Sequence, residues 1–361
     1  MRDVKIVLPI RVIVMEIVHL LVIARVVVVD PVNFYILKNK KITIIYFKGA
    51  VLFMKIAIYG FGNVGKWMCR RLLNSQKFIS DISIYVYDDM KKTTELNLEY
   101  IQTFKNNTPD FLNLFGNDKK IEFNLLYGDS ESFDLIYICV PTDSKSESDG
   151  SCNTDIVMKV INEIKNKRLS NTSIVLKSTV PPEFMNRLNK FEDSIDDAFY
   201  LKNNLYYSPE FSSKGPHGGS EDFMILGSYS GTSIPQTIYE LVSKSFPGSY
   251  KIHTCTWEEA SICKYFINSF LATKVLLCNE FAALCHKYNA NYNTVRNIVI
   301  EDKRIGPSHT FENESHSYKD SHCFMKDVKA LAEDSSEIMD MICAIRDINE
   351  SRIEMPINYK K

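Results

Sequence analysis

The sequence predicts an α/β fold, in which a doubly wound parallel sheet is followed by an α-helical domain built on one long central helix. Three observations support this prediction. A buried-strand pattern at 54–59 runs directly into a glycine-rich turn. Further apolar strands then alternate with helical patterns, which is typical of doubly wound sheets. Finally, residues 257–290 are apolar almost all round at helical spacing, so that we expect a long buried helix.

The composition is that of an ordinary globular chain. Its 361 residues are 45% hydrophobic and 24% charged, and this length allows two domains. The formal net charge of −1 gives no reason to expect nucleic acid or an anionic membrane as a partner. The nine cysteines are scattered and no Cys-x-x-Cys pair indicates zinc. We therefore expect no metal site and a reducing, cytoplasmic location.

The first 53 residues stand apart from the pattern that follows. Residues 4–29 are very apolar, but charged residues such as Arg11 and Glu16 interrupt them, which disfavours a transmembrane helix. No small-residue cleavage site follows them, which disfavours a signal peptide. Our first hypothesis is that Met54 is the true start of the protein. An added β-hairpin or a membrane-surface segment is the alternative.

The glycine-rich turn has the chemistry of a dinucleotide site. It reads Gly-Phe-Gly-Asn-Val-Gly and lies between the strand at 54–59 and a helical pattern at 66–73. The first glycine permits the tight turn, the second lets a pyrophosphate approach the backbone, and the third allows close packing of the helix. The phosphates then meet free N–H groups at the helix N-terminus. We therefore predict a Rossmann-like domain. Its expected cofactor contacts in the turn are Gly60, Phe61, Gly62, Asn63, Val64 and Gly65.

The next strand favours NAD over NADP. Residues 82–87 form an apolar strand that ends in Asp88-Asp89, at about the distance where a carboxylate reaches the ribose hydroxyls of NAD. No Arg follows closely enough to indicate a pocket for a 2′-phosphate. We predict NAD as the cofactor and Asp88 as the residue that binds its ribose.

The later strands end in small polar residues or proline. We expect strands at 133–140, 172–177 and 205–207, and a helix at 154–167. Ligands of such sheets bind at the carboxyl ends of the strands. The residues that follow the three strands are Pro141-Thr142, Ser178-Thr179-Val180-Pro181-Pro182 and Ser208-Pro209-Glu210-Phe211. Among these, Pro141, Thr142 and Thr179 are predicted to contact the cofactor.

The long helix is the second organising element. Thr256 and Glu259 form a capping-box pattern at its start, and apolar side chains follow on nearly every face up to about Ala290. A helix that is apolar on every side is buried on every side. In a chain of this size we expect a second subunit to share it, in a homodimer through 257–290. Lys264 and Asn268 lie four residues apart and so project from one face of this helix.

These motifs together resemble the UDP-glucose/GDP-mannose dehydrogenase family, whose members oxidise a nucleotide-sugar alcohol to a carboxylate. The resemblance covers Met54 to about Arg352. Beside the glycine turn it rests on Val140-Pro141-Thr142, Lys177-Ser178-Thr179-Val180-Pro181-Pro182, Ser208-Pro209-Glu210-Phe211, Lys264 and Asn268, Asn279-Glu280, Arg304-Ile305-Gly306 and Cys323-Phe324-Met325-Lys326-Asp327. It implies an NAD-dependent enzyme with a nucleotide-sugar substrate. By frequency within the family, we expect oxidation of UDP-glucose to UDP-glucuronate.

The resemblance identifies Cys323 as the nucleophile. Conversion of an alcohol to an acid takes two hydride transfers, and the intermediate aldehyde must not escape. A cysteine thiolate can add to this aldehyde as a thiohemiacetal, which becomes a thioester in the second oxidation and is then hydrolysed. We expect the following helix to begin at Val328, so that a helix N-terminal position is an alternative role for the Asp327 carboxylate.

Other residues match family positions with supporting roles. Lys264 and Asn268 match the residues that stabilise the developing oxyanion. Asp327 matches the residue that activates water, while Thr179 and Glu210 match residues that hold this water or assist proton transfer. The implied substrate contacts are Glu210, Phe211, Lys264, Asn268 and Arg304.

The sequence also departs from the family pattern. Residues 315–322 contain no glycine where the family places a glycine-rich loop, and a second acidic residue is replaced near Ser213-Lys214. We expect the family's third domain, which binds the nucleotide of the sugar, to be absent. The expected domains are an N-terminal extension at 1–53, an NAD-binding domain at 54–250 and a helical dimerisation domain at 251–361 that carries the catalytic cysteine.

Two other functions stay open. β-Hydroxyacid dehydrogenases resemble this chain in their Rossmann domain and in a long helix with Lys and Asn four residues apart. They perform a single hydride transfer and need no cysteine, so the motif around Cys323 argues against them. A degenerate family member that binds NAD and dimerises without catalysis is favoured by the missing glycines, but Cys323 and Asp327 argue against it.

Overall fold

The fold was analysed in a computed structural model, whose chain divides into two units, Met1–Leu52 and Phe53–Lys361. The structure describes residues 26–30, 33–38, 41–46, 53–75, 81–87, 121–122, 133–146, 148–167, 172–190, 201, 204–211, 223–231, 234–235, 238–239 and 251–354.

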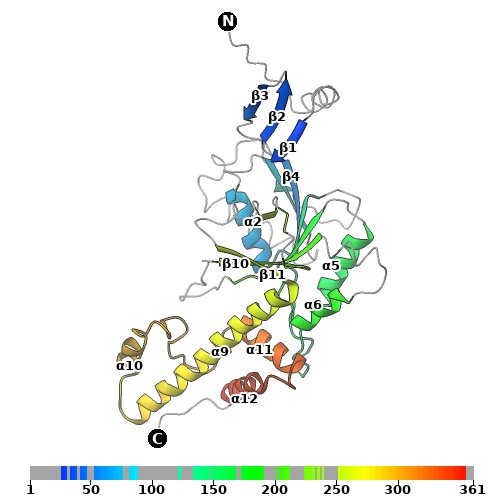
Figure 1. Cartoon of the computed structure of the whole chain (residues 1–361). Helices are drawn as coiled ribbons and strands as arrows, with labels where there is room; N and C mark the ends of the chain where they lie inside the picture. Colours follow the sequence, from blue (N-terminus) through cyan, green and yellow to red (C-terminus); the bar gives the residue numbers. More distant parts are fainter. Residues whose placement is uncertain are drawn as a thin grey trace. The chain divides into compact units, whose positions relative to one another are not determined.

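The first unit contains a small antiparallel sheet. Its strands are β1 (Val26–Asp30), β2 (Asn33–Lys38) and β3 (Lys41–Tyr46), and β2 lies between the other two (Figure 1). Strands at these positions agree with the hairpin alternative for the first 53 residues. The hypothesis that translation begins at Met54 stays a prediction.

The second unit is built on one sheet with the order β11-β10-β9-β8-β7-β4-β5-β6. The strands are β4 (Phe53–Tyr59), β5 (Asp81–Tyr87), β6 (Ile121–Glu122), β7 (Leu135–Ile138), β8 (Ser173–Leu176), β9 (Leu205–Tyr207), β10 (Phe223–Ser228) and β11 (Lys251–Thr256). Neighbouring strands are parallel except for β9 and β10, which are antiparallel. The predicted doubly wound sheet is therefore confirmed, with one antiparallel pair that the strand patterns did not predict.

The strand order reverses at β4. The chain proceeds from β4 through β5 to β6 on one side, and from β7 through β8 to β9 on the other. The carboxyl ends of β4 and β7 therefore flank the switch point, where ligands of open α/β sheets bind. The glycine turn follows β4 at this position, and Pro141-Thr142 closely follow β7.

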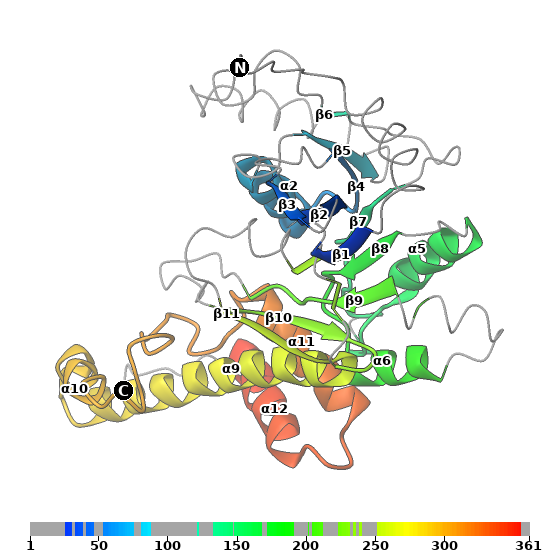
Figure 2. The ribbon, with the colours of Figure 1, turned by 45° about the horizontal axis from the view of Figure 1, so that its top comes forward.

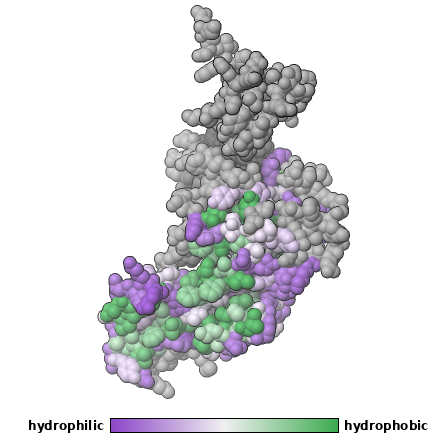
Figure 3. Space-filling model, in the orientation of Figure 1, coloured by the Kyte–Doolittle hydropathy of each residue, from purple (hydrophilic) through white to green (hydrophobic). Residues whose placement is uncertain are grey.

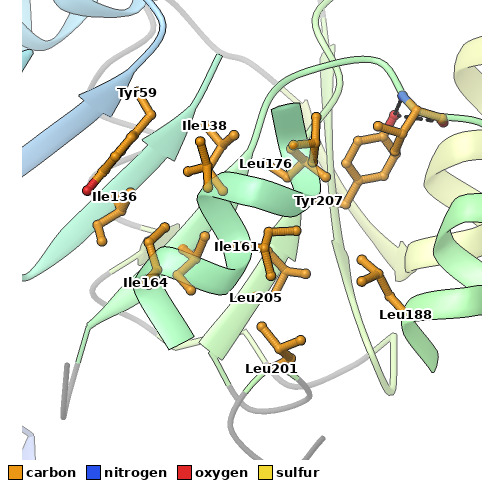
Figure 4. Close-up of a cluster of buried hydrophobic side chains, with 14 of the residues drawn as sticks. Tyr59, Ile136, Ile138, Ile161, Ile164, Leu176, Leu188, Leu201, Leu205 and Tyr207 are labelled. Carbon is orange, nitrogen blue, oxygen red and sulfur yellow. Dashed lines mark hydrogen bonds between the residues drawn. The ribbon is translucent and has the colours of Figure 1, made fainter. Parts of the chain in front are cut away.

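Helices cover both faces of the sheet. Along β4, Ile56 and Ile58 belong to the apolar cluster on the side of α2 (Asn63–Ser75), whereas Ala57 and Tyr59 belong to the cluster on the opposite side. That second side is covered by α5 (Asp155–Asn166) and α6 (Pro182–Asn189). Figure 4 shows side chains of α5 packed against β7 and β8. Burial on both faces explains why the strands are apolar throughout.

The C-terminal part of the unit is helical. It consists of α9 (Trp257–Lys287), α10 (Tyr292–Val299), α11 (His322–Asp334) and α12 (Asp340–Glu354), and both α11 and α12 pack on α9 (Figures 1 and 2). The predicted capping box of α9 is confirmed. The Thr256 hydroxyl accepts the Glu259 N–H at 3.2 Å, and the Glu259 carboxylate accepts the Thr256 N–H at 2.8 Å. The helix ends slightly before the predicted Ala290, because Asn289 is left-handed with φ 51°.

The α11 helix begins at His322, six residues earlier than the predicted start at Val328. The Ser321 hydroxyl caps it by accepting the Phe324 N–H at 3.4 Å. The expected start at Val328 missed the polar cap at Ser321 and the first turns of the helix, although Phe324 lies at helical spacing from Val328. As a consequence Cys323 and Asp327 both lie within the helix, four residues apart. Asp327 is in the second turn, so the alternative N-terminal role is wrong.

The α9 helix has one buried and one exposed face in the single chain. Its length and composition also pass the test for a membrane span, which the core helix of a globular protein can pass too. The buried face packs on α11 and α12 and includes Lys264 and Asn268. Apolar side chains that remain exposed on α9 are Ile262, Phe266, Phe270, Leu277, Phe281 and Leu284. Figure 3 shows apolar surface gathered along this helix. Burial on every side is therefore not reached within one chain.

Candidate active site

The glycine turn has the geometry that its pattern predicts. Gly60 is left-handed with φ +88°, and a Cβ there would lie 2.6 Å from the Cys139 carbonyl oxygen. A Cβ on Gly65 would lie 2.0 Å from the Gly60 carbonyl oxygen. Both positions thus require glycine for the fold itself, since real Cβ atoms do not approach backbone so closely.

Gly62 differs from the other two glycines, because a Cβ there would meet nothing within 4 Å. The space beside its backbone is open, which fits a position that a pyrophosphate must approach. Around it, Phe61 is buried in the core on the α2 side, Val64 packs against the same core and Asn63 is exposed at the start of α2. These residues fit an NAD phosphate site. The predicted ribose ligand Asp88 lies outside the described residues.

The ends of β7 and β8 are joined at the sheet edge. The Thr142 hydroxyl donates to the Thr179 carbonyl oxygen at 2.7 Å. The Cys152 thiol lies 3.7 Å from the Thr142 carbonyl oxygen and 3.9 Å from that of Thr179. Pro141 is exposed beside them. The structure therefore brings the three predicted cofactor contacts of the later strands to one place.

A buried polar cluster joins α9 to α11. The Asn268 amide donates to one oxygen of Asp327 at 2.6 Å, and the Lys326 ammonium lies 2.7 Å from the other oxygen. Asp327 is almost completely buried. Both of its oxygens are thus held by donors from two helices. Although burial lowers the pKa of Lys326, Asp327 and, more weakly, Cys152 and Cys323 outweigh it and raise that pKa overall.

Lys264 lies beside this cluster and is also buried. Its ammonium is 5.2 Å from the centre of the Phe211 ring, within the range of a cation–π contact. Burial lowers the pKa of Lys264, while the nearby Asp327, Cys323 and Glu210 oppose this shift. Lys264 is therefore placed between the residues that the sequence assigns to catalysis and those assigned to substrate binding.

Cys323 is exposed near the N-terminus of α11. Of the nine cysteines, only Cys263 and Cys323 are exposed, and Cys323 is the one that interacts electrostatically with Lys264 and Lys326. Its exposed thiol is open to a ligand, as a cysteine nucleophile must be. A cysteine with this exposure is not a small core residue.

Glu210 lies on the other side of Lys264 and is held by another lysine. One carboxylate oxygen is 3.3 Å from the Lys177 ammonium, and the other accepts the Phe211 N–H at 3.1 Å. Lys177 follows β8 directly and Glu210 follows β9. The ion pair therefore spans two neighbouring strand ends. The position of the replaced second acidic residue, near Ser213-Lys214, lies outside the described residues.

Arg304 is not brought to this cluster. Its side chain is 89% exposed and pairs with Asp302 in the loop after α10. The loop is fixed by Lys274 of α9, whose ammonium donates to the Ile305 carbonyl oxygen at 2.7 Å. A contact between Arg304 and a substrate stays a prediction.

The loop before Cys323 forms without glycine. His316 adopts a left-handed backbone with φ 50°, and Arg352 donates to its carbonyl oxygen at 3.0 Å. The Asn313 amide donates to the Ser317 carbonyl oxygen at 2.8 Å, and the Asn313 N–H donates to Asn279 of α9 at 3.0 Å. Buried polar contacts from α9 and α12 therefore hold this loop in place.

Sequence reasoning missed two residues of the site, Lys177 and Lys326. Each stood inside a quoted motif, Lys177 directly before Ser178-Thr179 and Lys326 directly before Asp327. The available signal was a lysine at the end of an apolar strand or beside a buried carboxylate. Such a lysine needs a partner of opposite charge.

Comparisons with known proteins match this geometry. The sequence model described as "UDP-glucose/GDP-mannose dehydrogenase family, NAD binding domain" matches residues 54–223, and that of the central domain of the same family matches 258–351. UDP-glucose 6-dehydrogenase of Rickettsia prowazekii is 30% identical over 251 residues, which are 68% of this chain and 55% of that protein. The chain thus spans about half the length of the first curated relatives that it matches.

Solved structures show the same fold. UDP-D-ManNAc dehydrogenase from Pyrococcus horikoshii superposes with a TM-score of 0.61 at 18% identity, over 83% of this chain and 69% of that one. A UDP-glucose dehydrogenase from Pyrobaculum islandicum gives a TM-score of 0.60 at 19% identity, with the same coverage of both chains. This chain therefore shares its fold with both structures.

Proposed function

Since this chain belongs to the UDP-glucose/GDP-mannose dehydrogenase family, we propose that it is an NAD-dependent nucleotide-sugar dehydrogenase that oxidises UDP-glucose to UDP-glucuronate. The single observation that carries this proposal is the cluster of Lys264, Asn268 and Asp327 beside an exposed Cys323. A one-step alcohol dehydrogenase needs no thiol at this position. A thiol beside a buried carboxylate suits a reaction that forms and then hydrolyses a thioester.

The proposed cofactor site is the glycine turn together with the ends of β7 and β8. Gly62 leaves space for the pyrophosphate, and the N-terminus of α2 supplies N–H groups and a favourable dipole for it. Bound NAD would supply the acceptor for the hydride lost by the sugar carbon in each oxidation. Thr142 and Thr179 stand at the neighbouring strand ends.

In the first oxidation, Lys264 and Asn268 stabilise the negative charge that develops on the sugar oxygen. Their side chains project from one face of α9, and both are buried. Donors in a site with little water act more strongly than they would in solvent. The proton that the alcohol loses in this step passes to Glu210, which matches a family residue that assists proton transfer.

In the second stage, Cys323 forms a bond from its sulfur to the aldehyde carbon. The resulting thiohemiacetal is oxidised to a thioester, which water then attacks. The carbon–sulfur bond breaks, the sulfur leaves as the thiolate, and Asp327 takes a proton from the attacking water. Because Asn268 and Lys326 hold both oxygens of Asp327, its position is fixed for this step.

Incubation of the protein with NAD and a panel of UDP- and GDP-sugars tests this function. We expect two equivalents of reduced cofactor for each UDP-glucose consumed, and UDP-glucuronate as the product. One equivalent with a released aldehyde or ketone would favour a single-step dehydrogenase. NAD binding without turnover of any sugar in the panel would favour a non-catalytic family member.

The proposed assembly is a homodimer in which a second copy covers the exposed face of α9. Six large apolar side chains of this helix remain exposed in one chain, including the stacked pair Phe266 and Phe270. Apolar patches of this kind mark interaction surfaces. Self-association through a helix face at a two-fold axis covers the same patch on both copies.

A further inference from the structure

We propose that Lys177 is a positioning residue for Glu210, which it holds at the edge of the sheet between the cofactor helix and the substrate-facing lysine. Lys177 follows β8 directly, and its backbone N–H donates to the Ile138 carbonyl oxygen at 2.8 Å. The backbone of Lys177 is thus fixed by the sheet. This inference rests on the proposed function, because Glu210 is taken to act in the reaction.

The contacts of the Lys177 ammonium define its role. It lies 3.3 Å from a Glu210 oxygen and 3.4 Å from the Ser208 hydroxyl, and 5.9 Å from the centre of the Trp67 ring. Trp67 belongs to α2, the helix that follows the glycine turn. Ser208 and Glu210 follow β9. Lys177 therefore contacts both the helix of the cofactor site and the strand end that carries the acid–base residue.

Lys177 is buried, and removal of its charge from water costs free energy. The Lys177 side chain is 2% exposed and that of Glu210 is 13% exposed. A buried ion pair is weak support for stability, since apolar residues of similar volume often stabilise a fold as well or better. The pair of Lys177 and Glu210 is therefore better explained by function. Lys177 fixes the position of a charged carboxylate at the carboxyl ends of β8 and β9.

Glu210 also lies between two lysines. The Lys177 ammonium pairs with its carboxylate directly. The negative charge of Glu210 also acts on Lys264, because it opposes the lowering of the Lys264 pKa. Phe211, the next residue, lies beneath the Lys264 ammonium. If Lys177 were absent, the carboxylate would be free to turn toward Lys264. Glu210 would then pair with the lysine that is proposed to stabilise the sugar oxyanion.

A double-mutant cycle tests the proposal, with Lys177→Met, Glu210→Gln and the two combined. We expect Lys177→Met to lower kcat by about tenfold to a hundredfold, as small misplacements of reacting groups do. KM for the sugar and the dissociation constant of NAD should change less than about threefold, because the glycine turn is untouched. The double variant should be no slower than Glu210→Gln alone, since Lys177 acts through Glu210.

Two matched variants complete the design. Lys177→Arg keeps a cation and should retain more turnover than Lys177→Met. Ser208→Ala removes the other close neighbour of the ammonium but leaves the ion pair, and its kcat should stay within about twofold of the wild type. The proposal is overturned if the kcat losses of Lys177→Met and Glu210→Gln simply multiply, or if Lys177→Met raises KM while kcat is unchanged.

Thermal unfolding of the wild type, Lys177→Met, Glu210→Gln and the double variant separates this proposal from the proposed function. If Lys177 holds Glu210, each single variant should melt at a lower temperature, and the double variant should recover part of the loss. Independent, additive losses would overturn the positioning role even in a protein that turns over no sugar. A wild type without turnover but with coupled melting shifts would contradict the reaction and support the Lys177–Glu210 contact.

Discussion

Lys264 combines burial with nearby carboxylates, and this balance sets its chemistry. Removal from water disfavours the ammonium form and lowers the pKa of Lys264, while Asp327 and Glu210 favour the charge. The result is an ammonium that deprotonates more easily than that of an exposed lysine. Such a group can donate a hydrogen bond to a developing oxyanion.

The loss of activity at alkaline pH should report the deprotonation of Lys264. Activity that depends on the Lys264 charge falls as pH rises through its lowered pKa. Arg stays protonated over the accessible range, so Lys264→Arg should be slower near neutral pH but should lose less activity as pH rises. The measurement is kcat/KM against pH for both proteins. An alkaline limb at the same pH in both would show that another group controls it.

Substitutions at Gly62 and Gly65 should affect two different properties, NAD binding and the stability of the fold. Gly62→Ala adds a Cβ that meets no protein atom within 4 Å, so folding should be unaffected while NAD binds at least about tenfold more weakly, or about 1.4 kcal/mol. Gly65→Ala places its Cβ 2.0 Å from the Gly60 carbonyl oxygen and should destabilise the fold, by about 1–3 kcal/mol or more. Calorimetric titration with NAD and thermal unfolding of both variants check this. Equal NAD affinity in wild type and Gly62→Ala would contradict the cofactor site.

Single residues show where sequence reasoning succeeds and where it ends. The roles of Gly60 and Gly65 follow from backbone rules, and the structure bears out both positions. Lys177 and Lys326 stood inside quoted motifs but were given no role, because their partners could not be identified from the sequence. Their burial depends on strands and helices that meet only in the fold.

At the level of elements, the two faces of α9 have different roles. One face contributes to the candidate active site and the other forms an exposed apolar surface. Its buried face carries Lys264 and Asn268 toward α11, while its exposed face carries a row of apolar side chains. The sequence predicted a helix apolar on all sides. It could not indicate which side the chain covers itself, because α11 and α12 come from later residues.

The exposed face of α9 should hold the proposed dimer together. Phe266 is 67% exposed and Phe270 is 60% exposed in one chain, and their rings are stacked at 6.4 Å. A charge at the centre of such an interface is costly, so Phe266→Glu should give a monomer at micromolar concentration. The molar masses of this variant and the wild type, measured by light scattering, test this prediction.

A matched control is Ile338→Glu, because Ile338 is also exposed but lies between α11 and α12. It should leave the dimer intact. A wild type that is already monomeric, or equal dissociation by both variants, would contradict the role of α9.

The start of α11 shows why element boundaries are harder to predict than elements. The helix was expected from Val328, but the Ser321 cap begins it at His322. The earlier start matters for function, because it puts Cys323 on the same helix as Asp327 and one turn away. Their relative position is then fixed by helical geometry.

At the scale of the whole molecule, residues 1–52 and 53–361 form separate units. The nucleotide-binding strand β4 begins at Phe53 and pairs with β5 and β7, both within the second unit. A protein that starts at Met54 should therefore fold and bind NAD as the full chain does. Circular dichroism and NAD titration of the shortened protein check this. Insoluble or unfolded material would show that the first unit supports the second.

The doubly wound parallel sheet followed from the alternation of strand and helix patterns. The antiparallel pair of β9 and β10 did not, since strand direction has no signature in a short apolar run. The position of the site was predictable because strand ends converge in such sheets. The distance of Arg304 from the cluster was not, because it depends on the path of the loop after α10.

The central claim is that one site performs two oxidations through a covalent bond to Cys323. Intact-protein mass measured after mixing with NAD and UDP-glucose tests it most directly, in the wild type, Cys323→Ser and Asp327→Asn. Asp327→Asn should accumulate a sugar–nucleotide adduct, because water lacks its base. Cys323→Ser should lose steady-state turnover, because a serine hydroxyl is far less ionised than a thiol and its ester is hydrolysed more slowly than a thioester. Turnover of Cys323→Ser at the wild-type rate, with no adduct on Asp327→Asn, would contradict the account.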